Sequence, residues 1–392
     1  MNMLPTPLPI AIIADAATPY RIAYHLRVAR ELPQYRLLSV FTHAQSNAKW
    51  SLEVPKDINP HFFGQDDAYA VSPLKTALKD VRKAKRVARL LTEQQVAVVV
   101  INGYGDFGRL WLMRWCRSRR IPYFIWGDSN ARGDLATGLK RTLKQLYLRR
   151  ILGNAAGALC CGSLGQEYFQ RYSVPSERIF WLPYEPDYKL IEQTSEAELE
   201  AVRSRFSLKR DRRRIVFTGR LAAVKRADLL IDAFITIAPQ RPQWDLLIIG
   251  DGPLGEELKT RVPAEWSHRV IWTGFIDDQA RVSALYKSAD VLVLPSDYEP
   301  WALVINEAVA SGLAVVASDV VGAAAELVRD GVNGYQFAAG NKADLEQKLL
   351  QVTGDGIDGL KANSATVLAA WREKADPVVG LAAAVEFALA QR

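Results

Sequence analysis

The sequence predicts an α/β protein with two doubly wound parallel sheets. The chain has 392 residues, which is more than one hydrophobic core usually serves. Short apolar runs of strand length alternate with longer helical stretches in both halves, as is typical of parallel sheets. The alternation lapses once, in the run LPYEPD at 182–187 and the polar stretch IEQTSEAELEAVRSRF that follows. We therefore expect a domain boundary there.

The first domain is expected at residues 1–186 and the second at 187–376, and residues 377–392 are apolar enough to pack as a further helix. Strands are expected in the first domain at 10–14, 37–41, 96–101, 123–126, 157–161 and 179–182. In the second domain they are expected at 215–218, 246–249, 270–273, 291–294, 314–317 and 334–337. Ligands of such sheets bind beyond the carboxyl ends of the strands.

The composition is that of a globular protein, with 49% hydrophobic and 24% charged residues, which excludes disordered and fibrous classes. No apolar run reaches the roughly 18 residues that span a bilayer, and the start MNMLPTPLPIAIIADA lacks a basic export signal, so a cytoplasmic protein is expected. Cys116, Cys160 and Cys161 are expected to be buried thiols. Neither they nor the four histidines have metal-ligand spacing, so no metal site is predicted.

The stretch ADVLVLPSDYEPWALVINEAVASGLAVV at 289–316 joins a predicted strand to a predicted helix. Pro295 ends the apolar strand, and the helix is expected at 301–311, with Pro300 in its first turn and Gly312 at its end. Glu299 lies at the junction, where helix N–H groups favour anions. Glu307 lies two turns into a nearly apolar helix, where an unpaired carboxylate costs several kcal/mol. A solvated edge is the alternative for each, but the two together favour a ligand with hydroxyl donors.

The segment SDYEPWALVINEA, with its two glutamates spaced as Glu-x7-Glu, resembles the donor-sugar motif of glycosyltransferase family 4, retaining enzymes of the GT-B fold. The segments FTGRLAAVKRADLLIDAF, DLLIIGDGPLGEELK, VIWTGFIDD and GLAVVASDVVGAAAELVRDGVNGYQF resemble the same family in the same order, over about 160 residues from Ile215. The resemblance implies two Rossmann-like domains facing a central cleft, with the acceptor on the first domain and a nucleotide-sugar on the second. It also implies that the C-terminal helix crosses back to the first domain.

Gly219, Arg220 and Lys225 follow the strand at 215–218. The planar fork of arginine and the compact charge of lysine suit a diphosphate, although two solvated cations would give the same pattern. The resemblance assigns Arg220 and Lys225 to the donor diphosphate and to the charge that develops on it. Gly250, in the GDGP turn, either approaches a ligand or forms a plain turn. Phe275 and Ile276 resemble the segment that faces the nucleobase, but Phe275 fits a core position equally well.

Within the central motif, the resemblance assigns Glu299 to the transferred sugar and Glu307 to the ribose. The N–H groups of Leu303 and Val304 would point toward the donor phosphate. Trp301 and Ala302 complete the predicted donor-binding set. Two departures from the family affect the fit of particular sugar hydroxyls. Ala302 stands where glycine is frequent, and the residue before Trp301 is a proline without an N–H.

Two positions of the first domain are candidates for the acceptor or phosphate side of the cleft. Tyr20 and Arg21 belong to a TPYR segment after the first strand; Arg21 either reaches a phosphate or acidic acceptor, or simply opens a helix. Asp128 stands in WGDSN, where several relatives have a histidine near the reacting sugar. We expect Asp128 to be catalytic, and a turn that caps a helix is the alternative.

The formal net charge is +7, and the cations of the first domain gather in three clusters. These are Lys75, Lys79, Arg82, Lys83, Lys85, Arg86 and Arg89; then Arg114, Arg117, Arg119 and Arg120; then Lys140, Arg141, Lys144, Arg149 and Arg150. In the first cluster Leu74, Leu78, Val81, Ala88 and Leu91 share one helical face. We expect this helix to contact an anionic membrane, and an ordinary surface helix packed on the sheet is the alternative. No nucleic-acid reader is recognisable.

The sequence therefore predicts a retaining hexosyltransferase that uses a nucleotide-sugar donor and a glycan or lipid-linked acceptor, without a cofactor or metal. It would be cytoplasmic or peripheral on the inner membrane face, in polysaccharide or glycolipid synthesis. Two alternatives stay open: a nucleotide-sugar epimerase or hydrolase of the same fold, and a non-catalytic protein that binds sugar nucleotides.

Overall fold

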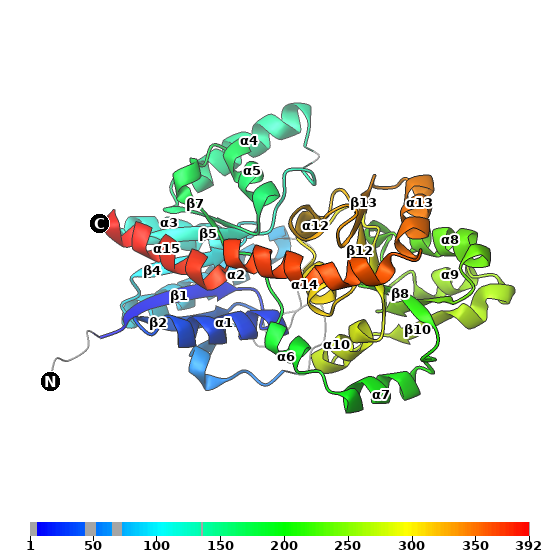
Figure 1. The fold of residues 1–392 in the computed structure, drawn as a ribbon. Helices are drawn as coiled ribbons and strands as arrows, with labels where there is room; N and C mark the ends of the chain where they lie inside the picture. The colour runs from blue at the N-terminus through cyan, green and yellow to red at the C-terminus, as the bar shows by residue number, and fades with distance from the viewer. Residues whose placement is uncertain (1–5, 44–51, 65–72, 135, 392) are drawn as a thin grey trace. The chain divides into compact units, whose positions relative to one another are not determined.

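The computed structural model describes residues 6–43, 52–64, 73–134 and 136–391. The chain forms two compact units, one of residues 1–184 with 375–392 and the other of residues 185–374 (Figure 1). The predicted boundaries, at 186 and 376, each lie two residues away from the observed ones. The first unit is therefore made of two separate stretches of chain.

The first unit contains a seven-stranded sheet in the order β3-β2-β1-β4-β5-β6-β7, in which every neighbouring pair is parallel. Its strands are β1 (Leu8–Ala14), β2 (Tyr35–Phe41), β3 (Pro60–Phe62), β4 (Val98–Asn102), β5 (Tyr123–Gly127), β6 (Gly157–Cys160) and β7 (Ile179–Trp181). The chain runs outward from β1 to β3 and then returns to β4 beside β1. The loops after β1 and β4 therefore diverge at a switch point, where such sheets bind ligands.

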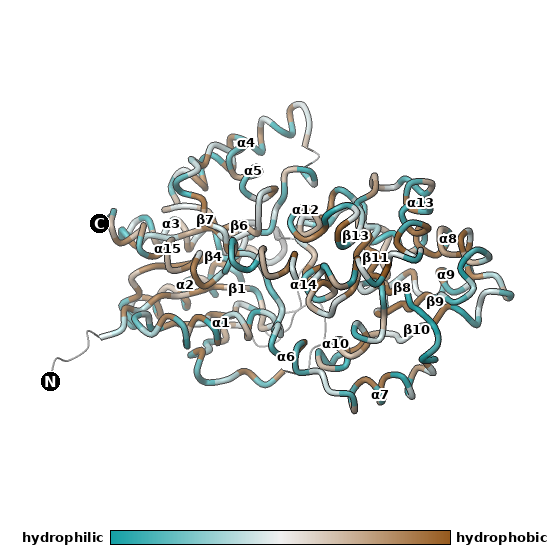
Figure 2. The backbone as a smooth tube through the Cα atoms, in the orientation of Figure 1, coloured by the Kyte–Doolittle hydropathy of each residue, from teal (hydrophilic) through white to brown (hydrophobic). Residues whose placement is uncertain are grey.

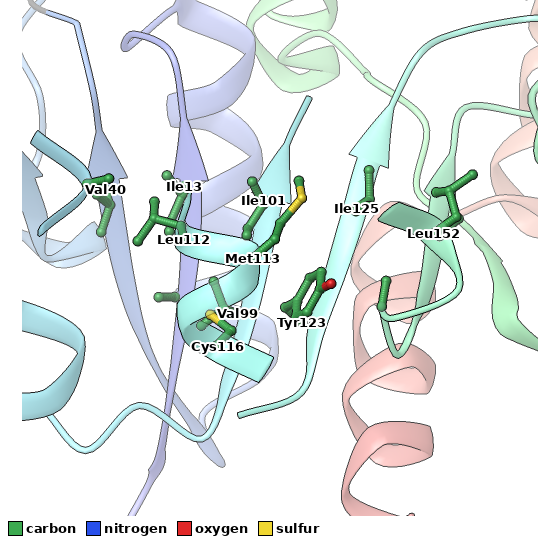
Figure 3. Packing of buried hydrophobic residues seen from close by; sticks show 14 of the residues in the cluster. Ile13, Val40, Val99, Ile101, Leu112, Met113, Cys116, Tyr123, Ile125 and Leu152 are labelled. Carbon is green, nitrogen blue, oxygen red and sulfur yellow. The ribbon is translucent and has the colours of Figure 1, made fainter. Parts of the chain in front are cut away.

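Helices cover both faces of this sheet. They are α1 (Pro19–Glu31), α2 (Pro73–Glu93), α3 (Phe107–Ser118), α4 (Gly138–Leu152), α5 (Ser163–Arg171) and α15 (Pro377–Ala390). Side chains alternate along β1, so that Ala11 and Ile13 pack with α2 and α3 while Ile10 and Ile12 pack with α1 and α15. Figure 3 shows the first of these layers, with Leu112 and Met113 of α3 over the strands.

The C-terminal helix α15 belongs to the first unit, where it packs on α1 and β7. Asp376 caps it by accepting from the N–H groups of Val378 and Val379, and also pairs with Arg27 of α1 at 2.6 Å. Gly380 allows a close approach to β7, because a Cβ there would lie 1.9 Å from the carbonyl oxygen of Trp181. The helix cap, the ion pair and the close packing together hold this C-terminal helix on the first sheet.

Helix α2 packs on the sheet through the residues that were expected to face a membrane. Ala88 and Leu91 belong to the core, together with Ala84 and Val87. Near the start of the helix, Leu78 is 78% exposed to solvent. The side chain of Leu74 lies outside the described residues. The prediction of a membrane-facing apolar side on α2 is therefore wrong, because the sheet needs that side for its own core.

The second unit contains a six-stranded parallel sheet in the order β10-β9-β8-β11-β12-β13. Its strands are β8 (Arg213–Thr218), β9 (Trp244–Ile249), β10 (Val270–Gly274), β11 (Val291–Leu294), β12 (Ala314–Ser318) and β13 (Gly334–Phe337). Its helices are α6 (Tyr188–Glu192), α7 (Glu196–Arg205), α8 (Ala227–Ile237), α9 (Gly255–Thr260), α10 (Gln279–Lys287), α11 (Leu303–Ala310), α12 (Gly322–Leu327), α13 (Lys342–Val352) and α14 (Ile357–Lys374). Figure 2 shows strand β11 of the second unit in brown, whereas helix α7, at the edge of the drawn tube, mixes teal with brown.

The predicted strands are all present, with ends that differ by at most a few residues. The edge strand β3 was missed, because a three-residue strand that begins with proline has no apolar run to mark it. Cys116, Cys160 and Cys161 are buried free thiols. Among the described residues, no helix combines the length and the apolar character needed to cross a bilayer.

Candidate active site

The candidate site lies at the carboxyl edge of the second sheet, where β8 and β11 are neighbours. The chain leaves β8 toward β9 and leaves β11 toward β12, so the loops after these two strands open away from each other. The loop after β8 carries Arg220 and Lys225, and the loop after β11 carries Glu299. The predicted catalytic residues of this unit therefore meet at its topological switch point.

Lys225 and Glu299 form an ion pair between Nζ and Oε2. Ser296 donates from Oγ to the same carboxylate oxygen at 3.3 Å. The two side chains are 25% and 12% exposed, which leaves them within reach of a ligand. The backbone joins the same two loops, because the N–H of Asp297 donates to the carbonyl of Val224 at 2.9 Å. Two residues 74 positions apart are thus held as one group.

Arg220 is exposed in the loop that also carries Lys225, immediately after Gly219. Arg226, which was not singled out from the sequence, also supports the site. It has a left-handed backbone (φ 52°), and its guanidinium contacts Asp228 at 3.2 Å and Asp297 at 3.1 Å. Its pKa is raised, chiefly by the hydrogen bond to Asp228. Arg226 therefore fixes the loop that presents Lys225, whereas Arg220 stays exposed for a ligand.

The segment Glu299–Trp301 is anchored against the start of α12. The N–H of Gly322 donates to the carbonyl of Glu299 at 3.1 Å, and the N–H of Ala323 donates to that of Trp301 at 2.7 Å. A Cβ on Gly322 would lie 2.0 Å from the carbonyl oxygen of Pro300, so only glycine fits. Gly322 was missed by the sequence reasoning, although a glycine that opens a helix after a strand was a usable signal.

The backbone corrects the predicted start of the helix in this motif, and burial restricts how Trp301 can contact a ligand. Helix α11 begins at Leu303, not at Trp301, because Ala302 has a left-handed conformation (φ 78°, ψ 80°) that no helix continues through. Pro300 therefore lies outside the helix. The Trp301 ring is 3% exposed and packs against Trp371 with centroids 5.7 Å apart, so the ring faces the core and only the backbone of Trp301 remains for a ligand.

The left-handed Ala302 explains why glycine is frequent at this position in the family that the segment resembles. It turns the chain so that Leu303 and Val304 are the first two residues of α11. Their N–H groups have no acceptor within the helix, and they stand at the positive end of its dipole. This arrangement suits a phosphate oxygen.

Glu307 is a buried carboxyl group, 7% exposed, on the same helix. Gln279 donates to it from Nε2 at 2.8 Å, and the Tyr286 hydroxyl donates at 3.2 Å. Burial raises its pKa to about 7, and these two hydrogen bonds only partly oppose the rise. Gln279 and Tyr286 lie on α10, and no sequence signal connected them with Glu307. Both of these partners are neutral donors, and neither is a cation. The carboxyl group therefore keeps acceptor capacity for hydroxyl donors of a ligand.

Two further predicted donor-binding segments have clear structural roles. A Cβ on Gly250 would lie 2.0 Å from the carbonyl oxygen of Gly219, and Gly250 also pairs with Gly274. The glycine is thus required by the close packing of adjacent strand ends, and its approach to a ligand stays a prediction. Phe275 is 47% exposed, so it is not a core residue, whereas Ile276 is buried at 5%.

The first unit brings its own polar residues to the switch point between β1 and β4. Arg21 lies in the first turn of α1 and is 7% exposed; it donates to the carbonyl of Ala16 at 2.9 Å and to Oδ1 of Asn102 at 3.0 Å. Its Nε has no hydrogen-bond partner among the described residues. The ring of Tyr20 lies 5.4 Å from that of Tyr184, edge to face. Arg21 therefore both opens the helix and aims its guanidinium at the strand ends.

Asp128 follows β5 in an irregular stretch, and the next helix of the described chain begins at Gly138, so the capping alternative for Asp128 is wrong. Burial, with the nearby Asp128 carboxylate, raises the pKa of Tyr184 well above its usual value. Beside them, Arg109 pairs with both Asp15 and Asp106. These partners were missed because 94 residues separate Asp15 from Arg109. A polar residue directly after a strand, as at Asp15, was the available signal.

Comparisons with known proteins agree with this geometry. Residues 212–355 match the family described as Glycosyl transferases group 1. The match lies within the second unit and covers most of it, so this unit is similar to a group 1 glycosyltransferase domain. An uncharacterized glycosyltransferase of Methanocaldococcus jannaschii is 33% identical over 178 residues, 44% of each chain. The lipopolysaccharide core biosynthesis mannosyltransferase LpsB of Rhizobium meliloti is 36% identical over 119 residues, 29% of this chain and 33% of that protein.

The chain spans about half the length of the first curated relatives it matches. Among solved structures, HepE of Anabaena in complex with UDP has a TM-score of 0.71 at 18% identity, over 98% of this chain and 99% of that one. The two parallel sheets with flanking helices are thus of the GT-B class. Membership of glycosyltransferase family 4 in particular stays a prediction.

Within the second unit, the site offers complementary groups for a sugar attached to a diphosphate. The Arg220 guanidinium, the Lys225 ammonium and the first N–H groups of α11 are donors for phosphate oxygens. Glu299 is an acceptor for hydroxyl groups. Among the described residues, no three His, Cys, Asp or Glu side chains come close enough together to hold a metal ion.

Proposed function

We propose that the chain is a retaining glycosyltransferase that moves a hexosyl group from a nucleotide-sugar to a glycan or lipid-linked saccharide. The observation that carries the proposal is the Lys225–Glu299 pair at the switch point of a domain similar to group 1 glycosyltransferases. It places a cation for a leaving phosphate in contact with an acceptor for sugar hydroxyls. A site for the nucleotide alone would not need the carboxylate.

In the proposed reaction, the bond between the anomeric carbon and the donor phosphate breaks as the acceptor oxygen bonds to the same face of that carbon. The released phosphate takes the acceptor proton. Arg220, Lys225 and the N–H groups of Leu303 and Val304 stabilise the negative charge that grows on the leaving diphosphate. Glu299, relieved of Lys225 by the phosphate, accepts hydroxyl donors of the sugar.

The proposed place of the ribose is Glu307. Its carboxyl group already accepts from Gln279 and Tyr286, and ribose hydroxyls would add further donors. Such donors favour the ionised form, which burial disfavours. Phe275, half exposed at 47%, is the proposed platform for the base.

The donor is tested by thermal shift of the full chain against UDP, GDP, ADP and their sugars. Ligand at about 100-fold over its Kd stabilises by about 2.7 kcal/mol. UDP is the first candidate, because the similar HepE structure is a complex with UDP. No shift with any nucleoside diphosphate would contradict the proposal.

Two other functions fit parts of the site and are separated from transfer by simple assays. An epimerase or hydrolase of the same fold consumes the nucleotide-sugar with no acceptor present. A protein that only binds sugar nucleotides shows affinity without turnover on any acceptor extract. Arg220 and Lys225 favour a catalytic role over binding alone, because they supply charge where a leaving diphosphate develops its own. The resemblance of the domain to group 1 glycosyltransferases favours transfer over hydrolysis.

The acceptor is proposed to be a glycan of polysaccharide or glycolipid synthesis, bound by the first unit. LpsB, named for lipopolysaccharide core biosynthesis, supports a saccharide acceptor. In the first unit, Arg21 opens α1 after β1, and Asp128 follows β5 beside β4, so the two offer both charges to a polar acceptor near the switch point. Arg21→Ala and Asp128→Asn are expected to raise the KM for the acceptor and leave donor binding unchanged.

A further inference from the structure

Helix α4 carries a stripe of large apolar side chains in solvent. Leu139, Leu143 and Leu146 are 76%, 59% and 63% exposed, and Tyr147 is 44% exposed. Spaced three to four residues apart, the leucines lie on one side of the helix. A single exposed leucine is ordinary, but a contiguous stripe on one helix marks an interaction surface.

The opposite side of the helix is fixed to the first unit, so the stripe is held outward. Leu148 and Leu152 are buried in the core of the sheet. Lys144 pairs with Asp134 at 2.7 Å and lies over the ring of Tyr168 at 5.1 Å. Figure 1 shows α4 at the rim of the ribbon, beside α5. The core does not use the leucine stripe, unlike the apolar side of α2.

The charge of α4 indicates which kind of partner can bind to the leucine stripe. The helix reads GLKRTLKQLYLRRIL and contains no acidic residue. Lys140, Arg141, Arg149 and Arg150 on the same helix are exposed. A second copy of this helix would bring like charges together, which disfavours a dimer through this face. Anionic headgroups above an apolar layer complement both features.

We propose that α4 docks the protein on an anionic lipid bilayer, with Leu139, Leu143 and Leu146 in the headgroup–acyl boundary and the cations on lipid phosphates. The helix lies flat in the interface. Binding is weak, reversible and lowered by salt, because a short stripe and a few screened charges hold it. The inference goes beyond the proposed function and does not require it, since it concerns no residue of the sugar-nucleotide site.

The test is sedimentation of the full chain with vesicles of phosphatidylcholine, with and without phosphatidylglycerol, and with no sugar nucleotide. Three variants are compared with the wild type: L139S/L143S/L146S, K140Q/R149Q/R150Q, and the control R82Q/K85Q/R89Q, which removes three exposed cations from α2. All changed residues are exposed, so circular dichroism and thermal unfolding should match the wild type.

We expect wild type to sediment with phosphatidylglycerol vesicles only. Both α4 variants should lose at least about tenfold in partition coefficient, since each cation near the surface contributes about fivefold, while the α2 control stays within about threefold. As a second readout, an environment-sensitive dye on Leu143→Cys should shift to shorter wavelength with these vesicles. The same dye on Leu78→Cys of α2, 78% exposed, should not shift.

Three results would overturn the inference. One is a wild type that does not sediment with anionic vesicles at low salt. Another is an α4 leucine variant that sediments as well as the wild type. The third is a leucine variant that changes from dimer to monomer while its vesicle binding stays the same, which would assign the stripe to a second copy of the chain. None of these results bears on donor binding, which the thermal-shift screen tests separately.

Discussion

Lys225 and Glu299 neutralise each other, so a donor diphosphate that recruits Lys225 must separate them. The separation costs little if the phosphate takes the lysine while sugar hydroxyls take the carboxylate at the same moment. A nucleoside diphosphate without a sugar would leave Glu299 without that compensation. The pair therefore gives the site a physical reason to prefer an intact donor over the product diphosphate.

Replacement of either cation should remove most transfer. Arg220→Ala and Lys225→Ala are expected to lower kcat on the order of 10²–10³-fold, because each charge acts most strongly on the developing leaving group. Steady-state kinetics measures the loss. Lys259→Ala, which removes another cation of the same unit, is the control. Turnover near that of wild type in either variant would exclude the role.

The two glutamates should separate in binding measurements. Glu307→Gln is expected to weaken the binding of a nucleoside diphosphate, whereas Glu299→Gln does not weaken it and depresses transfer. The reason is that one carboxylate is assigned to the ribose and the other to the sugar. Calorimetry with the diphosphate and with the full donor distinguishes them, and an equal loss of diphosphate affinity in both variants argues against the assignment.

Stability should depend on pH through Glu307. Its pKa is about 7 in the folded protein against 4.5 in the ordinary range, so the fold holds its proton more tightly than the unfolded chain does. The stabilisation is therefore fully present below about pH 4.5 and is lost as the pH rises through 7, by up to about 3 kcal/mol. Thermal unfolding of wild type and Glu307→Gln at pH 5 and pH 8 measures it. A difference between the two proteins that does not change with pH would contradict the shift.

At the scale of the element, the entry to α11 depends on Ala302. A left-handed conformation costs a non-glycine residue about 1–2 kcal/mol, and glycine loses about 0.5–1 kcal/mol more entropy on folding. Ala302→Gly should therefore be neutral or stabilise the fold by up to about 1 kcal/mol in chemical denaturation. Ala310→Gly, in the last turn of the same helix, should destabilise by about 1 kcal/mol. Equal destabilisation by both would refute the strain at Ala302.

The elements that followed local rules were predictable, and those that depend on distant contacts were not. The strand at 291–294 is marked by four consecutive apolar residues, and it is present with those bounds. The start of α11 was predicted at the wrong residue, because Pro300 favours a first helical turn. No feature of the local sequence shows that Ala302 adopts a left-handed conformation. The burial of the Trp301 ring could not be predicted for a similar reason, since its partner Trp371 lies 70 residues away on α14.

At the scale of the molecule, the first unit should depend on its last helix. Leu381 is fully buried between α15 and the sheet, so Leu381→Ala is expected to cost about 2–5 kcal/mol. Val379, 68% exposed on the same helix, provides the control, and Val379→Ala should change stability by less than about 0.5 kcal/mol. Urea denaturation followed by tryptophan fluorescence measures both. Similar effects for the two would show that α15 contributes little.

The two-sheet architecture was predictable because parallel strands buried on both faces read as continuous apolar runs, as in VVVIN of β4. The site in the second unit was predictable as a set of residues, from motifs that follow individual strands. The pairs that these residues form were not predictable, because they depend on which strands become neighbours. The pairs are Lys225 with Glu299 and Glu307 with Gln279. The membrane contact predicted for α2 was wrong for the same reason. The sequence of an amphipathic helix does not show whether lipid or a sheet will cover its apolar side.

Because the first unit consists of residues 1–184 and 375–392, a ribosome makes the whole second unit before it finishes the first. At ~5–20 residues per second, roughly 190 intervening residues take about 10–40 s. During that interval the side of the first sheet that α15 will cover is without its last helix, while residues 185–374 emerge in one piece. The second unit can therefore reach its native state earlier than the first. Nascent chains of this protein should be most vulnerable to aggregation, and most in need of a chaperone, just before residues 375–392 emerge.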